Sequence, residues 1–157
     1  MKNARCAAIG CVALWMAALS GPLLAQNHGS DLQERLVGAW RLVSLEEPDA
    51  QGQVQKADCS GLFVFSRDGH ASVQVMYAHP QSASGNAPVQ YAQGGYEASF
   101  GRYEVNDAHT FTFHVEGALV RTLVGKDLKR AYEFSGDRLI IQSPDPKEHW
   151  RVVWERE

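Results

Sequence analysis

Cysteine is scarce in this sequence, with three residues among 157. Cys6 and Cys11 lie within the first 25 residues, which leaves Cys59 alone in the rest of the chain. An intramolecular disulfide is therefore excluded once those 25 residues are removed, and packing alone must stabilise the domain that follows.

An excess of positive charge is also missing. The chain has 15 Lys and Arg residues against 18 Asp and Glu residues, for a formal net charge of −3. Proteins that bind nucleic acid gather lysine and arginine against the phosphate backbone. Because no basic stripe is present, we exclude nucleic acid as a partner.

Motifs for metal binding or nucleophilic catalysis are absent as well. Ser60 follows Cys59 with no base beside it to activate either side chain. The histidines show no close ligand spacing; they are His28, His70, His79, His109, His114 and His149. We expect no metal ion and no cofactor.

The sequence begins with the pattern of a secretory signal peptide. Lys2 and Arg5 precede an uncharged apolar run over residues 6–19, and small residues lead to Ala25. This run is shorter than the roughly 20 residues that a transmembrane helix needs. We therefore expect cleavage after Ala25, export to the periplasm or the exterior, and a mature domain over residues 26–157 without an integral membrane span. An uncleaved anchor is the alternative.

The mature part consists of short alternating runs separated by turn signals, which is typical of an all-β protein. A short helical turn is expected over residues 31–37, where Asp31 and Glu34 have the spacing of a capping box. Eight strands are expected at residues 40–46, 61–66, 71–77, 100–105, 110–116, 129–134, 138–142 and 149–155.

The connections between these runs predict how the strands pair. Residues 67–70, 106–108 and 135–137 have the composition of tight hairpin turns, which join antiparallel neighbours. Eight such strands form an up-and-down β-barrel, and closure removes exposed edges. The interior of an eight-stranded barrel is just wide enough for side chains or one small ligand.

Two connections are longer. Residues 79–99 begin with loop composition and continue with a segment that favours one or two helical turns; they form either a binding loop or lid, or a plain surface excursion. Residues 117–128 are apolar in the middle, which predicts a short strand or packing at the barrel rim.

Several motifs occur in a fixed order along the mature chain: residues 36–44, 63–69, 72–76, 100–105, 114–117, 132–134, 136–139 and 153–156. Together they resemble the bacterial and fungal lipocalin-like domain family. The resemblance implies a small antiparallel β-barrel with a helical turn before the first strand and a tryptophan at the closed end. Ligand binding is then expected by analogy of fold. The chain is shorter than secreted vertebrate lipocalins and lacks their disulfide pair, so retinoid or pheromone binding is not carried over.

Four residues are expected to have structural roles at the first and last strands. Gly38 and Trp40 open the first strand, and Trp154 and Arg156 lie in the last. We expect Trp40 to plug one end of the barrel, with the guanidinium of Arg156 stacked on its indole ring. Any ligand site would then lie at the other end.

Strand 110–116 has two faces, and the sequence leaves open which one lines the barrel. Alternation places Phe111, Phe113 and Val115 on one face, with Thr112, His114 and Glu116 on the other. Either the aromatic face forms the core, or His114 and Glu116 point inward as polar groups of a mostly apolar pocket.

Four further residues are candidates for the cavity wall: Gln74, Tyr103, Arg130 and Tyr132. Tyrosine also serves as core with its hydroxyl bonded at a rim. An inward Arg130 would be costly without a partner, so it would require either Glu116 or an anionic ligand.

The sequence thus favours an exported lipocalin-like barrel that binds a small hydrophobic or amphipathic molecule. A packed barrel that acts as an envelope structural or interaction module is the second interpretation. A cofactor-free cyclase or isomerase, with His114 as a base oriented by Glu116, is the third.

Overall fold

The computed structural model describes residues 31–49, 51–79 and 95–157. Residues 31–36 form a short helix, and Arg121–Leu123 form a 3-10 turn, η2. The described strands are β1 (Gly38–Pro48), β2 (Val54–Lys56), β3 (Cys59–Phe65), β4 (His70–Tyr77), β5 (Tyr96–Val105), β6 (Thr110–Ala118), β7 (Asp127–Ser135), β8 (Arg138–Gln142) and β9 (Arg151–Arg156). None of the described helical segments has the length and apolar character needed to cross a bilayer.

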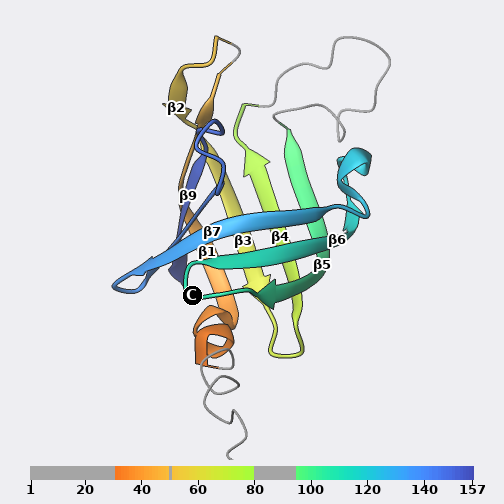
Figure 1. Ribbon diagram of the computed structural model, residues 1–157. Coiled ribbons are helices and arrows are strands. Elements are labelled where there is room, and N and C mark those ends of the chain that lie inside the picture. Colours follow the sequence, from red (N-terminus) through yellow and green to blue (C-terminus); the bar gives the residue numbers. More distant parts are fainter. Residues whose placement is uncertain (1–30, 50, 80–94) are drawn as a thin grey trace, which may run out of the picture.

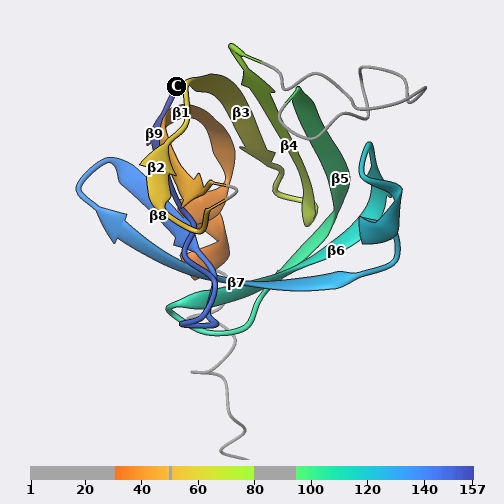
Figure 2. The same ribbon diagram turned by 90° about the horizontal axis from the view of Figure 1, so that it is seen from above.

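These strands form one antiparallel sheet that closes on itself. The order is β2-β1-β3-β4-β5-β6-β7-β8-β9, and β1 also pairs with β9. Figures 1 and 2 show the strands surrounding a common interior. β2 only extends β1 as a short hairpin, through pairs such as Glu46–Lys56. The remaining eight strands form the barrel, as the sequence predicted.

The strand bounds agree with the sequence prediction within a few residues, apart from β5. β5 begins at Tyr96, so the expectation that the loop continues to residue 99 is wrong, as is a helical turn at residues 96–97. Pairs from Met76–Tyr96 to His70–Arg102 fix this part of the chain to β4. The rest of that expected loop, residues 80–94, and the expected signal peptide over residues 1–25 lie outside the described residues.

Two of the three tight turns predicted from the sequence contain a glycine. Gly69 (φ 86°) and Gly136 (φ 64°) have positive φ, a conformation that L side chains rarely adopt. Gly69 joins β3 to β4, and Gly136 joins β7 to β8. Both positions therefore require glycine and give consecutive antiparallel strands.

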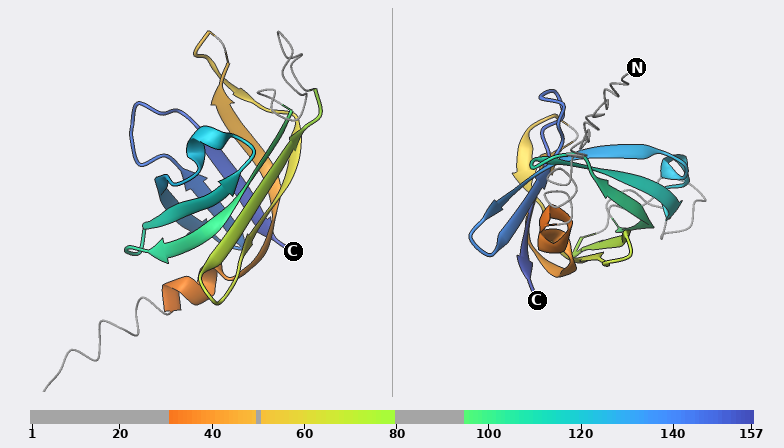
Figure 3. Two further views of the ribbon diagram at one scale, coloured as in Figure 1. Left: turned by 90° about the vertical axis from the view of Figure 1, so that its right-hand side faces the viewer. Right: turned by 60° about the horizontal axis from the view of Figure 1, so that its bottom comes forward.

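The helix over residues 31–36 lies against one end of the barrel (Figure 3). Its expected capping box is not seen among the described hydrogen bonds. Instead, both carboxylate oxygens of Glu34 accept hydrogen bonds from Arg67, over 2.7 and 2.9 Å. This pair ties the helix to the β3–β4 turn.

Trp40 closes the same end. It is 1% exposed, and its Nε1 donates to the carbonyl oxygen of Leu36 over 2.7 Å. Arg156 stacks on the indole, with Cζ 4.2 Å from the ring centroid, and donates to the carbonyl oxygens of Val37 and Arg35, each over 2.7 Å. The predicted pair of Trp40 and Arg156 is therefore confirmed.

Gly38 is required beside this pair. Its φ is 136°, and a Cβ placed there would lie 2.6 Å from Nη1 of Arg156. A side chain would strain the backbone and displace the guanidinium that covers Trp40.

Replacing Trp40 with alanine should lower the free energy of unfolding by about 3–5 kcal/mol, because a fully buried indole leaves a cavity at the closed end. Chemical denaturation of the purified protein measures the change. Met76→Ala is the matched control, since Met76 is 56% exposed, and it should stay within about 0.5 kcal/mol of the wild type. Wild-type stability in Trp40→Ala would contradict the role of Trp40 as the plug.

Candidate functional site

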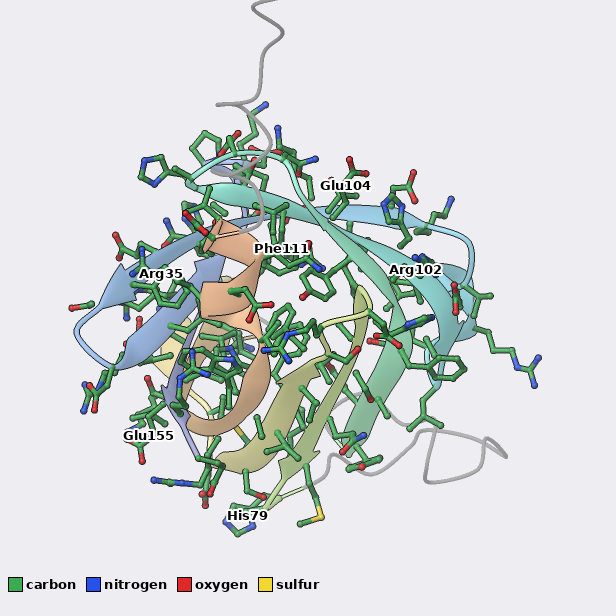
Figure 4. The ribbon with its side chains drawn as sticks, turned by 90° about the horizontal axis from the view of Figure 1, so that it is seen from below. Arg35, His79, Arg102, Glu104, Phe111 and Glu155 are labelled. Atoms are coloured by element: carbon green, nitrogen blue, oxygen red, sulfur yellow. The ribbon has the colours of Figure 1, made fainter. Side chains whose placement is uncertain are left out.

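The aromatic face of β6 points into the barrel. Phe111, Phe113 and Val115 are 0%, 4% and 2% exposed, and the residues between them are more exposed. Figure 4 shows Phe111 inside the barrel and Glu104 of the neighbouring strand on its outside. The interpretation with His114 and Glu116 inside is wrong, because the apolar side chains have taken the interior.

His114 instead forms a polar contact on the outer wall. Its Nδ1 lies 2.7 Å from Oδ1 of Asp127, and its Nε2 lies 4.0 Å from Oε2 of Glu104. The register pairs His114 with Arg102 on one side and Asp127 on the other. Glu116 is exposed on the same outer face. His114 and Glu116, which were expected to act as a base and its orienting carboxylate, therefore lie outside the barrel and do not line a cavity in its interior.

The two tyrosines face inward but are held by the backbone. Tyr103 Oη donates to the carbonyl oxygen of Ser66 over 3.0 Å, and Tyr132 Oη donates to that of Asp107 over 3.2 Å. Both rings pack among the aromatic side chains around Phe65 and Phe111. They complete the core near the closed end and do not line the cavity described next.

Gln74 points away from the interior. On β4 the inward residues are Ala71 and Val75, which are 4% and 7% exposed, and Gln74 belongs to the opposite face. Its Nε2 donates to Oγ of Ser72, another outward residue, over 3.1 Å.

The barrel interior contains a cavity of about 200 Å³ that is partly open to solvent, on the side of the core away from Trp40. Its wall is mostly aliphatic and aromatic and comes from all eight strands of the barrel. The lining residues are Leu45, Phe63, Val73, Val75, Ser99, Phe111, Phe113, Leu123, Leu128, Arg130, Ile141, Trp150, Val152 and Trp154. Leu123 comes from η2, so the connection after β6 packs at the barrel rim. The sequence had predicted either this packing or a short strand for residues 117–128.

Arg130 is the one charged residue of this wall. It pairs with Phe111 in the β6–β7 ladder, which places both side chains on the inner face. Its guanidinium stacks on Trp150, with Cζ 5.0 Å from the ring centroid, and Nη1 donates to the carbonyl oxygen of Lys129 over 3.3 Å. Of the six candidate ligand residues, Arg130 alone lines the cavity.

No carboxylate neutralises Arg130 at close range. None of the ion pairs within residues 31–49, 51–79 and 95–157 includes it. Burial lowers the pKa of the guanidinium, and Glu148 nearby acts in the opposite direction. Because arginine stays protonated in proteins, the wall carries a positive charge.

A second polar group of side chains lies further along the inner faces, at the open end. Tyr77 and Glu97 are two positions beyond the lining residues Val75 and Ser99. Tyr77 Oη donates to Oε2 of Glu47 over 3.2 Å. Partial removal from water and the charge of Glu47 raise the pKa of Glu97, although Glu97 is an exposed residue at the mouth of the barrel. Burial and both carboxylates raise the pKa of Tyr77.

In the part of the chain that the structure describes, no three His, Cys, Asp or Glu side chains come together as they would to hold a metal ion. The cavity residues that sequence reasoning missed are mainly apolar. The alternation of apolar residues along each strand identifies these residues as inward-facing. Alternation alone does not distinguish a residue that lines a cavity from one that fills the core.

The fold and the cavity define a class of protein, a closed antiparallel β-barrel with a small apolar chamber inside. The lipocalin-like domain family matches residues 37–156, and the chain belongs to this family. The resemblance inferred from the sequence motifs is thereby confirmed.

A search of the curated proteins found no match. The solved structure of an uncharacterized protein from Bacteroides eggerthii is similar at 17% identity and a TM-score of 0.46, covering 78% of this chain and 99% of that chain. A redesigned β-barrel is similar at 12% identity and a TM-score of 0.42, covering 83% and 96%. Neither similarity is close enough to inform the site.

Glu97→Gln should stabilise the protein at neutral pH. A carboxyl group whose pKa is raised by folding contributes stability below its ordinary pKa of about 4.3, and this contribution is lost as the pH rises through the raised value. The melting temperature of Glu97→Gln should therefore exceed that of the wild type at pH 7.5, and the two should converge near pH 4. Glu116→Gln on the outer face is the control. A lower melting temperature for Glu97→Gln at pH 7.5 would contradict the raised pKa.

Proposed function

We propose that the protein binds a small, largely hydrophobic molecule with an anionic head group inside the barrel, and that it does so as an exported protein. The composition of residues 1–25 supports export. The lipocalin-like barrel supports binding of a small ligand in general, and the cavity wall supports the chemistry of that ligand.

The observation that carries the proposal is the charge of Arg130 in a wall that is otherwise almost entirely apolar. Removing a guanidinium from water is costly, and the contact with Trp150 compensates only in part. A carboxylate matches the planar fork of the guanidinium with two hydrogen bonds. A ligand with a carboxylate and an apolar chain would pair its carboxylate with Arg130 and pack its chain against the apolar lining residues.

The size of the cavity restricts the ligand. Pockets for drug-sized molecules span about 300–1,000 Å³, whereas this cavity measures about 200 Å³. A fatty acid of medium chain length therefore fits the proposal better than a sterol or a polycyclic molecule.

One observation favours the second function, an interaction module. Met76, Tyr96 and Phe100 are 56%, 41% and 57% exposed on the outer face of β4 and β5. Scattered surface apolar residues are ordinary, but neighbouring ones often mark a contact surface. If no ligand binds saturably, the interaction module would be favoured over small-molecule binding.

Competition against a fluorescent anionic probe, 1-anilinonaphthalene-8-sulfonate, tests the proposal with decanoic acid and 1-decanol at pH 7.5. Decanoic acid should displace the probe saturably. In Arg130→Gln, affinity for decanoic acid should fall by about 10- to 100-fold, because hydrogen bonds to a charged group contribute about 1.5–3 kcal/mol. Affinity for 1-decanol should change little.

Arg138→Gln is the matched control, because Arg138 is an exposed arginine at the start of β8. It should bind decanoic acid like the wild type. Arg130→Gln should also be as stable as the wild type without ligand, since it removes a charge with no close carboxylate partner. Equal affinities of Arg130→Gln and the wild type for decanoic acid would exclude Arg130 as the anion site.

A further inference from the structure

The connection between β8 and β9 brings a carboxylate to the edge of the cavity. Residues 143–150 link the two strands, and Asp145 fixes their backbone. Its Oδ1 accepts from the amide of Lys147 over 2.9 Å, and its carbonyl oxygen accepts from the amide of Glu148 over 3.0 Å. Oε2 of Glu148 in turn accepts from Nε1 of Trp150 over 3.3 Å. Glu148 is therefore held beside a residue of the cavity wall.

Trp150 contacts two opposite charges at the same time. Cζ of Arg130 lies over the indole ring, 5.0 Å from its centroid, whereas the indole N–H, which lies in the plane of the ring, donates to the carboxylate of Glu148. The face of the ring thus holds the cation, and its edge holds the anion. Both contacts are favourable, the first as a cation–π interaction and the second as a hydrogen bond to a charged acceptor.

Arg130 and Glu148 nevertheless do not pair with each other. None of the ion pairs in the described part of the chain joins them. The two groups are still near enough to interact, because burial lowers the pKa of Arg130 and the charge of Glu148 opposes this effect. A guanidinium and a carboxylate in direct contact often form two parallel hydrogen bonds. Such a pair would occupy Arg130 with a carboxylate of the protein and exclude that of a ligand.

We infer that Trp150 keeps Glu148 away from Arg130 and thereby makes the cavity selective for an anionic ligand. The indole binds the guanidinium on its face and the carboxylate at its edge, so each charge is retained where it cannot reach the other. Trp150 is a positioning residue, because it acts on the head group of the ligand through Arg130. The inference rests on the proposed function, since selectivity requires a ligand in the barrel.

Binding of decanoic acid and 1-decanol to Trp150→Leu tests the inference. Leucine keeps an apolar side chain in the wall but has neither a ring face nor an N–H group, so Glu148 should pair with Arg130. The preference for decanoic acid over 1-decanol should then fall about tenfold. The ratio of the two affinities is measured because loss of the indole from the wall weakens both ligands alike.

Rescue by Glu148→Gln distinguishes this role from a simple loss of wall surface. In the Trp150→Leu background, Glu148→Gln removes the competing carboxylate, and the preference for decanoic acid should return to within about threefold of the wild type. Glu116→Gln, which removes an exposed carboxylate from the outer wall, is the matched control and should restore nothing. A preference that stays low in the variant with both Trp150→Leu and Glu148→Gln would overturn the inference.

Glu148→Gln alone keeps the test decisive if Trp150→Leu does not fold. Glu148 is exposed, so this variant should be as stable as the wild type. Its affinity for decanoic acid should stay within about threefold of the wild type, because the intact indole already holds the carboxylate away from Arg130. A gain of about tenfold or more would mean that Glu148 competes for Arg130 in the wild type, and it would overturn the inference.

A measurement without ligand separates the inference from the proposed function. In ¹⁵N-correlated NMR spectra, Glu148→Gln should leave the Nε–H resonance of Arg130 in place when Trp150 is present and should shift it in Trp150→Leu, where the ion pair forms. A shift in both backgrounds, or in neither, would overturn the inference. If no acid binds, the proposed function fails, whereas this comparison still decides whether Trp150 keeps the two charges apart.

Discussion

The pairing of β1 with β9 is the constraint on which the rest of the structure depends. It runs from Trp40–Arg156 to Glu46–Arg151 and turns an open sheet into a barrel with an inside. Because Trp40 and Arg156 are directly paired, closure itself brings the guanidinium over the indole. Once an inside exists, the period of two along each strand assigns every side chain to the interior or to solvent. The plug, the cavity and the outward position of His114 all follow from that assignment.

Much of the fold could be predicted from the sequence, because turn glycines and alternation are local signals. The Asp68–Gly69 turn is an example. The closed end at Trp40 was instead implied by the resemblance to a family and by the residues of the first and last strands. The site was predicted less well. Alternation divided Thr110–Glu116 correctly into two faces, but only closure shows which face is inside. Gln74 was misplaced although its own strand put Val73 and Val75 on the opposite face, and those apolar residues determine the inner side.

The tyrosines illustrate a different limit. Tyr103 and Tyr132 face the interior, yet their hydroxyls are bound by the carbonyl oxygens of Ser66 and Asp107, beside the β3–β4 and β5–β6 turns. These hydrogen bonds depend on where the turn of a hairpin lies in three dimensions. The periodicity of residues along a strand does not predict that position. For Arg130 the sequence supplied two alternative partners, Glu116 or an anionic ligand, and the outward position of Glu116 eliminates Glu116.

The polar groups of the interior are distributed unevenly, and this distribution bears on how the proposed ligand would lie in the barrel. The cavity wall contains the guanidinium of Arg130, whereas the carboxylates of Glu47 and Glu97 lie further toward the open end, beside Tyr77. The anionic head group of the proposed ligand would be attracted to Arg130 on the β7 wall and repelled by the two carboxylates. Arg130 is a departure from ordinary core chemistry, because its charge has no close counterion among the described residues and lies in this cavity. A departure of that kind costs stability, and folded proteins keep it mainly where it serves a function. A barrel selected only for packing would have an apolar residue at position 130.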